Sequence, residues 1–190
     1  MKVMVIPEDP TLDQFILKPI VEHIFADCQE RPRVQVLSNP RLRGVAQALD
    51  AAMLQHIVSM YPMIDLFLVM VDRDGDEQKR PAEARARESE HPGRVLVCLA
   101  VEEVEVWMLA LHRARLDDSW QAIRAERDPK ERYAQPFLTA HAPRLAPGGG
   151  RVWAMRSLGS EWRGLLSVCT EIDELKTRIA TWLATHQPGP

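Results

Sequence analysis

Three aspartates, Asp72, Asp74 and Asp76, alternate along the chain directly after the short apolar run Leu66–Val71. A run so short and so continuously apolar is typical of a strand that is buried on both faces in a parallel sheet. The residues that follow such a strand lie at the C-terminal edge of the sheet, where open α/β sheets place their ligands. Carboxylates there would supply oxygen ligands for a hard divalent cation such as Mg2+. A polar turn is the competing interpretation, because Asp and Gly also favour turns.

A second acid occupies the equivalent place after the first predicted strand. Glu8 follows the apolar segment Lys2–Ile6. If the first and third strands are neighbours in a parallel sheet, Glu8 and the aspartates after the third strand lie within metal-bridging reach of one another. Two or more carboxylates around one Mg2+ would suit phosphodiester chemistry, since the bound metal polarises a phosphoryl oxygen and activates water. For the nearby Asp9 and Asp13, the competing interpretation is helix capping and favourable charge at a helix N-terminus.

A third group of acids, Glu102, Glu103 and Glu105, follows the predicted strand Arg94–Ala100. Side chains two positions apart point away from each other on a helix, so only some of these three can face one site. A charged first helical turn is the alternative interpretation, because it suits the helix dipole.

The elements that would position these acids alternate between strand and helix along the first 127 residues. This order predicts an α/β fold, with a doubly wound parallel sheet of about four strands, helices on both faces and right-handed crossovers. The predicted strands are Lys2–Ile6, Arg33–Leu37, Asp65–Val71 and Arg94–Ala100. The predicted helices are one that follows Thr11, then Gly44–Met60, Glu102–His112, Asp117–Arg127, Ser160–Cys169 and Thr170–His186.

The other segments divide the chain into a core and an extension. Residues 77–93 are charged and mixed in sign, which indicates either a solvated helix or a mobile loop. Residues 128–151 are predicted to be irregular. We therefore expect an α/β core over 1–127, a C-terminal irregular and helical extension packed on the same domain over 128–186, and a frayed tail over 187–190.

Composition excludes several functional classes. The net charge of −3 gives no global basic signature, so any contact with nucleic acid needs a local patch. The three cysteines are far apart and match neither a zinc site nor a disulfide framework, which favours a reducing cytoplasm. The sequence shows no signal peptide and no apolar stretch long enough to span a bilayer, so we expect a cytoplasmic protein without a membrane partner. No P-loop motif is present, so the chain is not itself a P-loop ATPase.

Taken in order, the acidic motifs resemble those of Toprim catalytic domains. The resemblance is closest to the small bacterial Toprim-like proteins related to the overcoming-lysogenization-defect (OLD) nucleases, and it spans most of the chain. The matching segments are EDPTLD with Glu8, the DRDGD run from Asp72 to Asp76, EVEVW with Glu103 and Glu105, DPK with Lys130, and SLGSEWRGLL before the last two helices. The resemblance implies a Toprim-like, Rossmann-type fold and a Mg2+- or Mn2+-dependent nuclease that acts on DNA in bacterial defence or DNA processing. It also implies an ATPase partner encoded nearby.

The chain departs from the family pattern at two acids. The first metal set, formed by Glu8, Asp72 and Asp74, is complete. The second set lacks an acid at Leu12, which only Asp13 could replace one place along, and another acid at Leu111.

These motifs predict roles for individual side chains. Glu8, Asp72 and Asp74 would hold Mg2+ or Mn2+, and Asp76 would be a weaker ligand. A further set would act around them: Glu103 and Glu105 as ligands of a second ion or as a base, and Lys130 as a positive charge that steadies the scissile phosphate. For Lys130 a solvated side chain beside a Pro turn is the competing interpretation.

Two other functions stay open from the sequence. A haloacid-dehalogenase-like phosphatase would use Asp72 as its nucleophile, but the Thr expected after Gly75 is Asp76. A non-catalytic metal-binding or regulatory subunit of an ATPase complex is favoured by the altered first motif. The segment in which Trp153 and Trp162 lie among Arg151, Arg156 and Arg163 would serve such a subunit as an interface with protein or nucleic acid.

The Gly-rich turn Pro147–Gly150 would then either approach a phosphate or form a flexible loop. The sequence leaves a homo-oligomer open.

Overall fold

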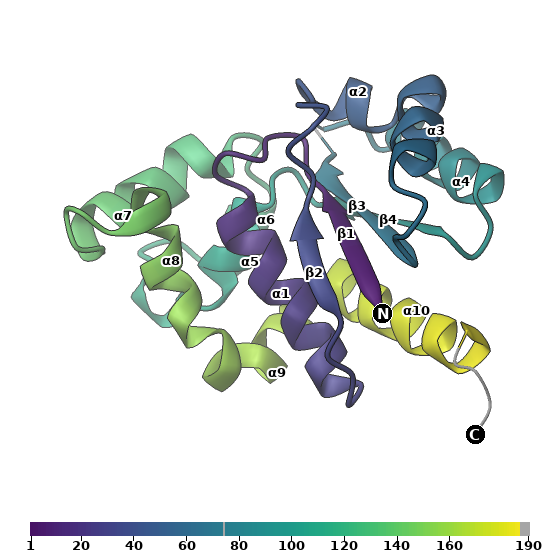
Figure 1. The fold of residues 1–190 in the computed structure, drawn as a ribbon. Coiled ribbons are helices and arrows are strands. Elements are labelled where there is room, and N and C mark those ends of the chain that lie inside the picture. Colours follow the sequence, from purple (N-terminus) through teal and green to yellow (C-terminus); the bar gives the residue numbers. More distant parts are fainter. Residues whose placement is uncertain (74, 187–190) are drawn as a thin grey trace.

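A four-stranded parallel sheet forms the centre of the computed structural model, which describes residues 1–73 and 75–186 (Figure 1). The strand order is β2-β1-β3-β4. The strands are β1 (Lys2–Ile6), β2 (Arg33–Val36), β3 (Leu66–Asp72) and β4 (Val95–Ala100). The predicted parallel sheet of four strands is therefore confirmed. Two predictions fall outside the described residues, namely the role of Asp74 and the frayed tail 187–190.

Helices and helical turns make up most of the remaining chain. The α-helices are α1 (Gln14–Asp27), α2 (Val45–Ala48), α3 (Ala51–Met60), α4 (Lys79–Glu90), α5 (Glu105–Ala110), α6 (Trp120–Arg124), α7 (Gln135–His141), α8 (Arg151–Ala154), α9 (Leu158–Val168) and α10 (Thr170–His186). The tighter or wider turns are η1 (Arg113–Arg115), the π-helical η2 (Lys130–Ala134), η3 (Pro147–Gly150) and η4 (Met155–Ser157).

The order of the strands brings the predicted acid-bearing ends together. β1 pairs with β3, with Ile6 opposite Val69. The first and third strands are therefore neighbours, which is the condition for Glu8 to lie near the aspartates. β3 pairs in turn with β4, with Asp72 opposite Ala100. Because all these strands run in the same direction, the residues that follow them share one edge of the sheet.

Both faces of the sheet are covered, and every residue of β3 is buried. Alternate strand residues such as Phe67 and Val69 pack with residues of α2, α3 and α4. The intervening residues such as Leu68 and Met70 pack with residues of α1, α5, α9 and α10 on the other face (Figure 1). The C-terminal extension thus contributes to the same core as the sheet. No helix in the described part of the chain is long and apolar enough to cross a membrane.

Two predictions about helices were wrong. The single helix expected over Gly44–Met60 is broken after α2, because the side chain of Asp50 accepts a hydrogen bond from Met53 N (2.8 Å) and so caps a new helix, α3. Residues 128–151, predicted to be irregular, include η2 and α7. These short helical segments bury only a few apolar side chains, such as Phe137 and Leu138, so their periodicity is weak.

The charged segment after β3 forms the helix α4 and not the mobile loop that was the other prediction for residues 77–93. Only Ala84 of α4 is buried, so little apolar packing supports this helix. Ion pairs between neighbouring turns add to its stability, as between Arg80 and Glu83 (2.9 Å) and between Arg87 and Glu90 (2.6 Å).

Glu171 connects the C-terminal extension to the core. Its carboxylate accepts hydrogen bonds from Trp107 Nε1 (2.9 Å) and from both terminal nitrogens of Arg124 (2.8 and 3.1 Å). The side chains of Arg124 and Glu171 are only 18% and 11% exposed, so neither can be solvated fully if its partner is removed. This carboxylate therefore joins α10 to α5 and α6.

We expect Glu171→Ala to lower the free energy of unfolding by about 2–3 kcal/mol, because it leaves two buried donors without an acceptor. The control is Arg132→Ala, because Arg132 lies 2.5 Å from its partner Glu126 but has a side chain that is 63% exposed. That change should cost less than about 1 kcal/mol. Urea unfolding of both variants measures the difference, and equal losses would contradict the role given to Glu171.

Candidate functional site

Carboxylates gather at the C-terminal edge of the sheet, where β1, β3 and β4 end. Asp72 is the last residue of β3. The negative charges of Glu8, which follows β1, and of Glu105, which follows β4, are close enough to raise its pKa. Asp13, at the start of α1, belongs to the same group. We call these four residues, Glu8, Asp13, Asp72 and Glu105, the acidic cluster. Three of the residues predicted from sequence to form the site are thus brought together.

The pKa of Asp72 is shifted further than that of Asp13. It is buried, and its Oδ1 accepts a hydrogen bond from Val104 N (2.9 Å), which fixes the orientation of the carboxylate. Burial raises its pKa to about 9, with further contributions from the negative charges of Glu8 and Glu105. A bound cation would reverse both effects, since it would favour the charged form.

Asp13 lies in the cluster although the family pattern would place its acid at Leu12. Asp9 N donates a hydrogen bond to Asp13 Oδ2 (3.1 Å), so the loop after β1 folds back onto this side chain. Burial, together with the nearby charge of Glu105, raises the pKa of Asp13 to about 7. The sequence analysis predicted two possible roles for Asp13, at a helix N-terminus or in place of the acid missing at Leu12. Its side chain faces the other acids, as the second role requires.

The three acids after β4 diverge, because the chain is not helical until Glu105. Glu105 is 1% exposed and faces the cluster. Glu103 instead accepts a hydrogen bond from Lys130 N (2.6 Å), and burial raises its pKa to about 7. Glu102 has a φ of 69° and pairs with Arg73 (2.5 Å). Glu103 therefore anchors the turn that carries Lys130, and the roles of base or ligand stay predictions for Glu103 and Glu105.

Lys130 lies beside the cluster and is not the solvated side chain of the competing interpretation. Its Nζ is 3.9 Å from Glu105 Oε1, and its side chain is 31% exposed. Burial disfavours its charge, but the carboxylates of Glu105, Asp13 and Glu103 together hold its pKa above the usual value. Lys130 is consequently a charged ammonium group next to the acids at neutral pH.

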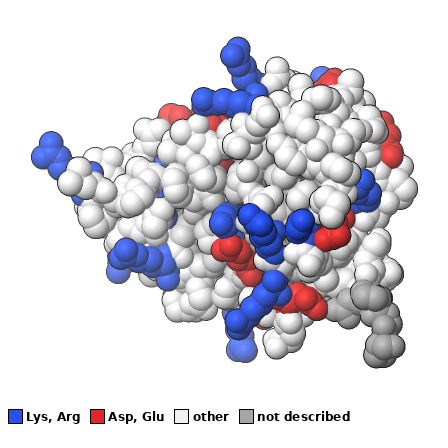
Figure 2. Space-filling model, viewed as in Figure 1, with Lys and Arg blue, Asp and Glu red and all other residues white. Residues whose placement is uncertain are grey.

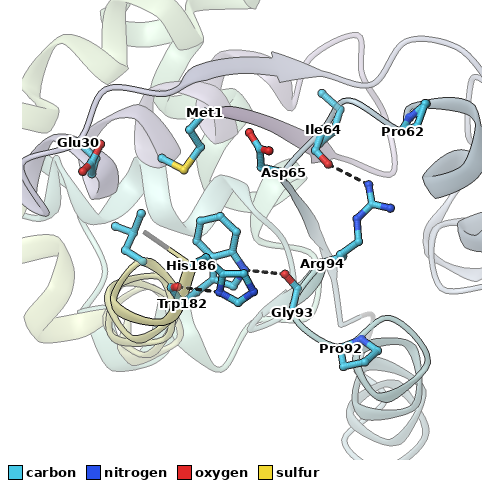
Figure 3. A pocket seen from close by; sticks show the side chains of 11 residues that line it. Met1, Glu30, Pro62, Ile64, Asp65, Pro92, Gly93, Arg94, Trp182 and His186 are labelled. Carbon is cyan, nitrogen blue, oxygen red and sulfur yellow. Dashed lines mark hydrogen bonds between the residues drawn. The ribbon is translucent and has the colours of Figure 1, made fainter. Parts of the chain in front are cut away.

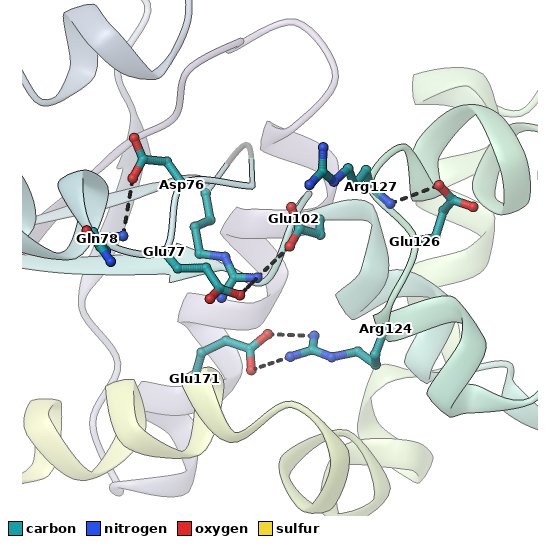
Figure 4. A network of polar contacts seen from close by, with 9 residues as sticks. Asp76, Glu77, Gln78, Glu102, Arg124, Glu126, Arg127 and Glu171 are labelled. Atoms are coloured by element: carbon teal, nitrogen blue, oxygen red, sulfur yellow. Dashed lines mark hydrogen bonds and ion pairs between the residues drawn. The ribbon is translucent and has the colours of Figure 1, made fainter.

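Asp76 is engaged elsewhere. Its Oδ1 accepts hydrogen bonds from Gln78 N (3.2 Å) and Lys79 N (2.8 Å), and these bonds hold its pKa below the usual range. Figure 4 shows Asp76 turned toward Gln78, at the start of α4. Asp76 thus serves as a cap of α4, and its predicted role as a weaker metal ligand would require these bonds to break.

A separate polar network lies near the acidic cluster. Arg73 pairs with Glu102 and with Glu77, and the pocket they line also contains Arg124 and Arg127 (Figure 4). Acids and arginines there largely neutralise one another, so this network explains the placement of Glu102 outside the cluster.

Arg151 belongs to the site, although the sequence analysis placed it only in a possible interface with protein or nucleic acid. Its side chain is 4% exposed, and its Nη2 lies 2.5 Å from Glu105 Oε1. The glycines before it all have positive φ, and a Cβ on Gly150 would lie 2.7 Å from the Cβ of Ala142. The turn predicted as a flexible loop or a phosphate contact is therefore a packed turn that delivers Arg151 to the cluster.

The donors of the cluster suit a hard cation, since all are carboxylate oxygens. Within residues 1–73 and 75–186, however, no group of three or more His, Cys, Asp or Glu side chains is arranged to hold a metal ion. Mg2+ commonly takes only one or two carboxylates and fills its other positions with water or phosphate. Glu8 and Asp72 can supply these two, and Asp74 would follow them in the sequence. The residues present therefore fit a partly hydrated Mg2+ or Mn2+ ion.

A basic side chain lies at the rim of the site. The guanidinium of Arg41 donates a hydrogen bond to Thr11 Oγ1 (3.0 Å) and lies 3.9 Å from Asp9, in the loop that follows Glu8. Its side chain is 67% exposed. On the face drawn in Figure 2, Lys and Arg atoms project at the upper edge, toward which β1 points in Figure 1. Arg41 thus places one exposed positive charge beside the loop that follows Glu8.

A pocket of about 740 Å³ lies at the opposite edge of the sheet, beside the residues that precede β1, β3 and β4. Trp182 donates a hydrogen bond to Gly93 O and its ring stacks on His186 (Figure 3). Because this pocket lies at the starts of the strands, it has no part in the acidic cluster.

Fold and site together define a Rossmann-like α/β protein with a buried acidic cluster at the C-terminal edge of its sheet. No protein-family model matches the chain, and no curated protein sequence matches it. We therefore infer function from the residues of the site.

Without metal, we expect Asp72→Asn to stabilise the protein by about 1 kcal/mol or more at pH 8. Folded Asp72 keeps its proton up to a pKa of about 9, whereas the unfolded chain loses it near 3.8. The folded state binds more protons over this range, so wild-type stability falls as pH rises from 4 to 9. The advantage of the variant should grow over the same range in urea unfolding with EDTA. An advantage that does not change with pH would contradict the burial of this charge.

Gly150→Ala should lower the free energy of unfolding by about 1–3 kcal/mol, because Gly150 has a φ of 94° and little space for a Cβ. Gly159→Ala, in α9, is the matched control, since a Cβ there meets nothing within 4 Å. It should be neutral or stabilising by about 0.5–1 kcal/mol. Thermal unfolding of both variants distinguishes a packed turn from a flexible loop, for which both changes would be tolerated.

Proposed function

We propose that this chain is a Mg2+- or Mn2+-dependent, Toprim-like nuclease, or the nuclease subunit of a complex, that hydrolyses nucleic-acid phosphodiesters. The observation that carries the proposal is the burial of Asp72 beside Glu8 and Glu105 at the ends of three parallel strands. Like charges are costly to bury together, so their convergence at a ligand-binding edge indicates function more than stability.

Glu8 and Asp72 would hold the metal ion, and Asp74 would be a third ligand. When bound, the ion would supply Lewis-acid polarisation of a phosphoryl oxygen and a lower pKa for bound water. Asp72 is oriented for this role by its hydrogen bond from Val104 N. Binding would also relieve the repulsion between the acids and so stabilise the folded state.

The cationic side chains would orient the phosphodiester. Lys130 is a charged ammonium group at the edge of the cluster, where it can attract the negative charge that develops on the phosphate. Arg41 is exposed at the rim and can contact a neighbouring backbone phosphate. Such contacts carry no sequence information, so they fit a nuclease with weak sequence preference.

An ATPase partner belongs to the same proposal. It is supported by the resemblance of the acidic motifs to those of OLD-type nucleases. The alternative is a metal-binding regulatory subunit that does not cut, which the altered motif around Leu12 favours. DNA is the expected substrate.

The first test is a thermal shift with Mn2+ or Mg2+. A ligand at 100 times its Kd stabilises the folded state by about 2.7 kcal/mol, which for a chain of this size raises Tm by about 5–10 °C. Asp72→Asn should abolish the shift. The matched control is Asp65→Asn, because Asp65 lies about 23 Å away at the other end of the same strand. It should keep the full shift.

The second test is nicking of supercoiled plasmid with Mn2+, alone and with any ATPase that proves to be encoded beside this gene. We expect cleavage by wild type and Asp65→Asn, and a loss of at least about 100-fold in Asp72→Asn and Lys130→Ala. A metal shift without cleavage in either condition would favour the regulatory subunit. No shift in the wild type would contradict the metal site itself.

A further inference from the structure

We infer that Arg151 and Lys130 are permanent cationic partners of Glu105, so that the acidic cluster binds one divalent cation and none at Glu105. The inference rests on the proposed function, because it concerns the number of metal ions in the same site. Arg151 is a positioning residue here, since it acts on Glu105 and not on the substrate.

The contacts of Glu105 carry the first step. Its side chain is 1% exposed, and Oε1 lies 2.5 Å from Arg151 Nη2 and 3.9 Å from Lys130 Nζ. A carboxylate so deeply buried must be paired or must lose its charge. Two positive side chains share one of its oxygens, so Glu105 is already neutralised by the protein.

The two aspartates of the cluster are not paired in the same way, although the charge of Lys130 also reaches Asp13. Among the ion pairs of residues 1–73 and 75–186, none joins Asp13 or Asp72 to a Lys or Arg side chain. Both aspartates are buried and face the charge of Glu105. Among the described residues, positively charged side chains therefore lie beside Glu105 but not beside Asp72. One divalent ion bound at Asp72 would compensate the negative charge there.

The backbone shows that Arg151 is held in this position. Gly148, Gly149 and Gly150 have φ values of 65°, 60° and 94°, which L side chains rarely adopt. A Cβ on Gly148 would overlap the ring of Phe15 in α1, and one on Gly150 would overlap Ala142. Three glycines thus let the turn pack against α1 and the end of α7, immediately before Arg151.

Lys130 is held by an independent contact. Glu103 accepts a hydrogen bond from Lys130 N (2.6 Å), which fixes the start of the π-helical turn η2 against the segment before α5. Two elements far apart in the sequence therefore converge on Glu105. Since Arg stays protonated at any physiological pH, the charge on this side of the cluster does not depend on the metal supply.

The test counts the Mn2+ ions bound per chain, from the electron paramagnetic resonance signal of free Mn2+ and from isothermal titration calorimetry. The wild type should bind one ion. Arg151→Gln frees the carboxylate of Glu105 and should admit a second ion. Arg163→Gln is the control, because Arg163 is an exposed arginine of α9, and it should still bind one.

A double variant, Glu105→Gln with Arg151→Gln, keeps the inference testable if the single variant does not fold. It removes both charges and keeps a hydrogen-bonding pair, so it should bind one Mn2+ with a Kd within about threefold of the wild type. Binding weakened more than about tenfold would show that Glu105 is a ligand and overturn the inference. Two ions in the wild type, or one in folded Arg151→Gln, would overturn it as well. No binding in the wild type would instead overturn the proposed function.

Discussion

The burial of several carboxylates at one edge of the sheet is the constraint on which the rest of the site depends. A single ionised carboxylate is costly to bury, and neighbours of the same sign add to the cost. The carboxylates differ in how their buried charge is compensated. Glu105 has Arg151 and Lys130 as partners, whereas Asp72 has a backbone N–H and a strongly raised pKa. This asymmetry is what a cation on the Asp72 side would correct.

Packing of the sheet between two helical layers offsets the free-energy cost of burying these carboxylates. β3 is buried along its whole length between two helical layers, so its C-terminal end is held rigidly where Asp72 lies. The extension after residue 127 is part of the same structure. It delivers Lys130 through η2 and Arg151 through the glycine turn, and Glu171 fastens its last helix to α5 and α6. Core and extension are therefore both needed to complete the site.

Local patterns were sufficient to predict the parts of the molecule that local physics determines. The apolar runs predicted the four strands, and the acids directly after them predicted the positions of Glu8, Asp72 and Glu105. Arg151 could not be predicted, because it meets Glu105 only after the chain has folded, and its sole local signal is the run of glycines. Asp76 was predicted as a ligand from its spacing, but its carboxylate accepts hydrogen bonds from Gln78 N and Lys79 N at the start of α4.

The position of a bound Mn2+ ion tests the central claim most directly. Crystals soaked in Mn2+ would show it as an anomalous scattering peak. One peak, with carboxylate oxygens of Glu8 and Asp72 about 2.1 Å away and with the Arg151–Glu105 pair intact, is the predicted result. A peak on Glu105 with Arg151 displaced, or the absence of any peak at this edge of the sheet under saturating Mn2+, would contradict the account.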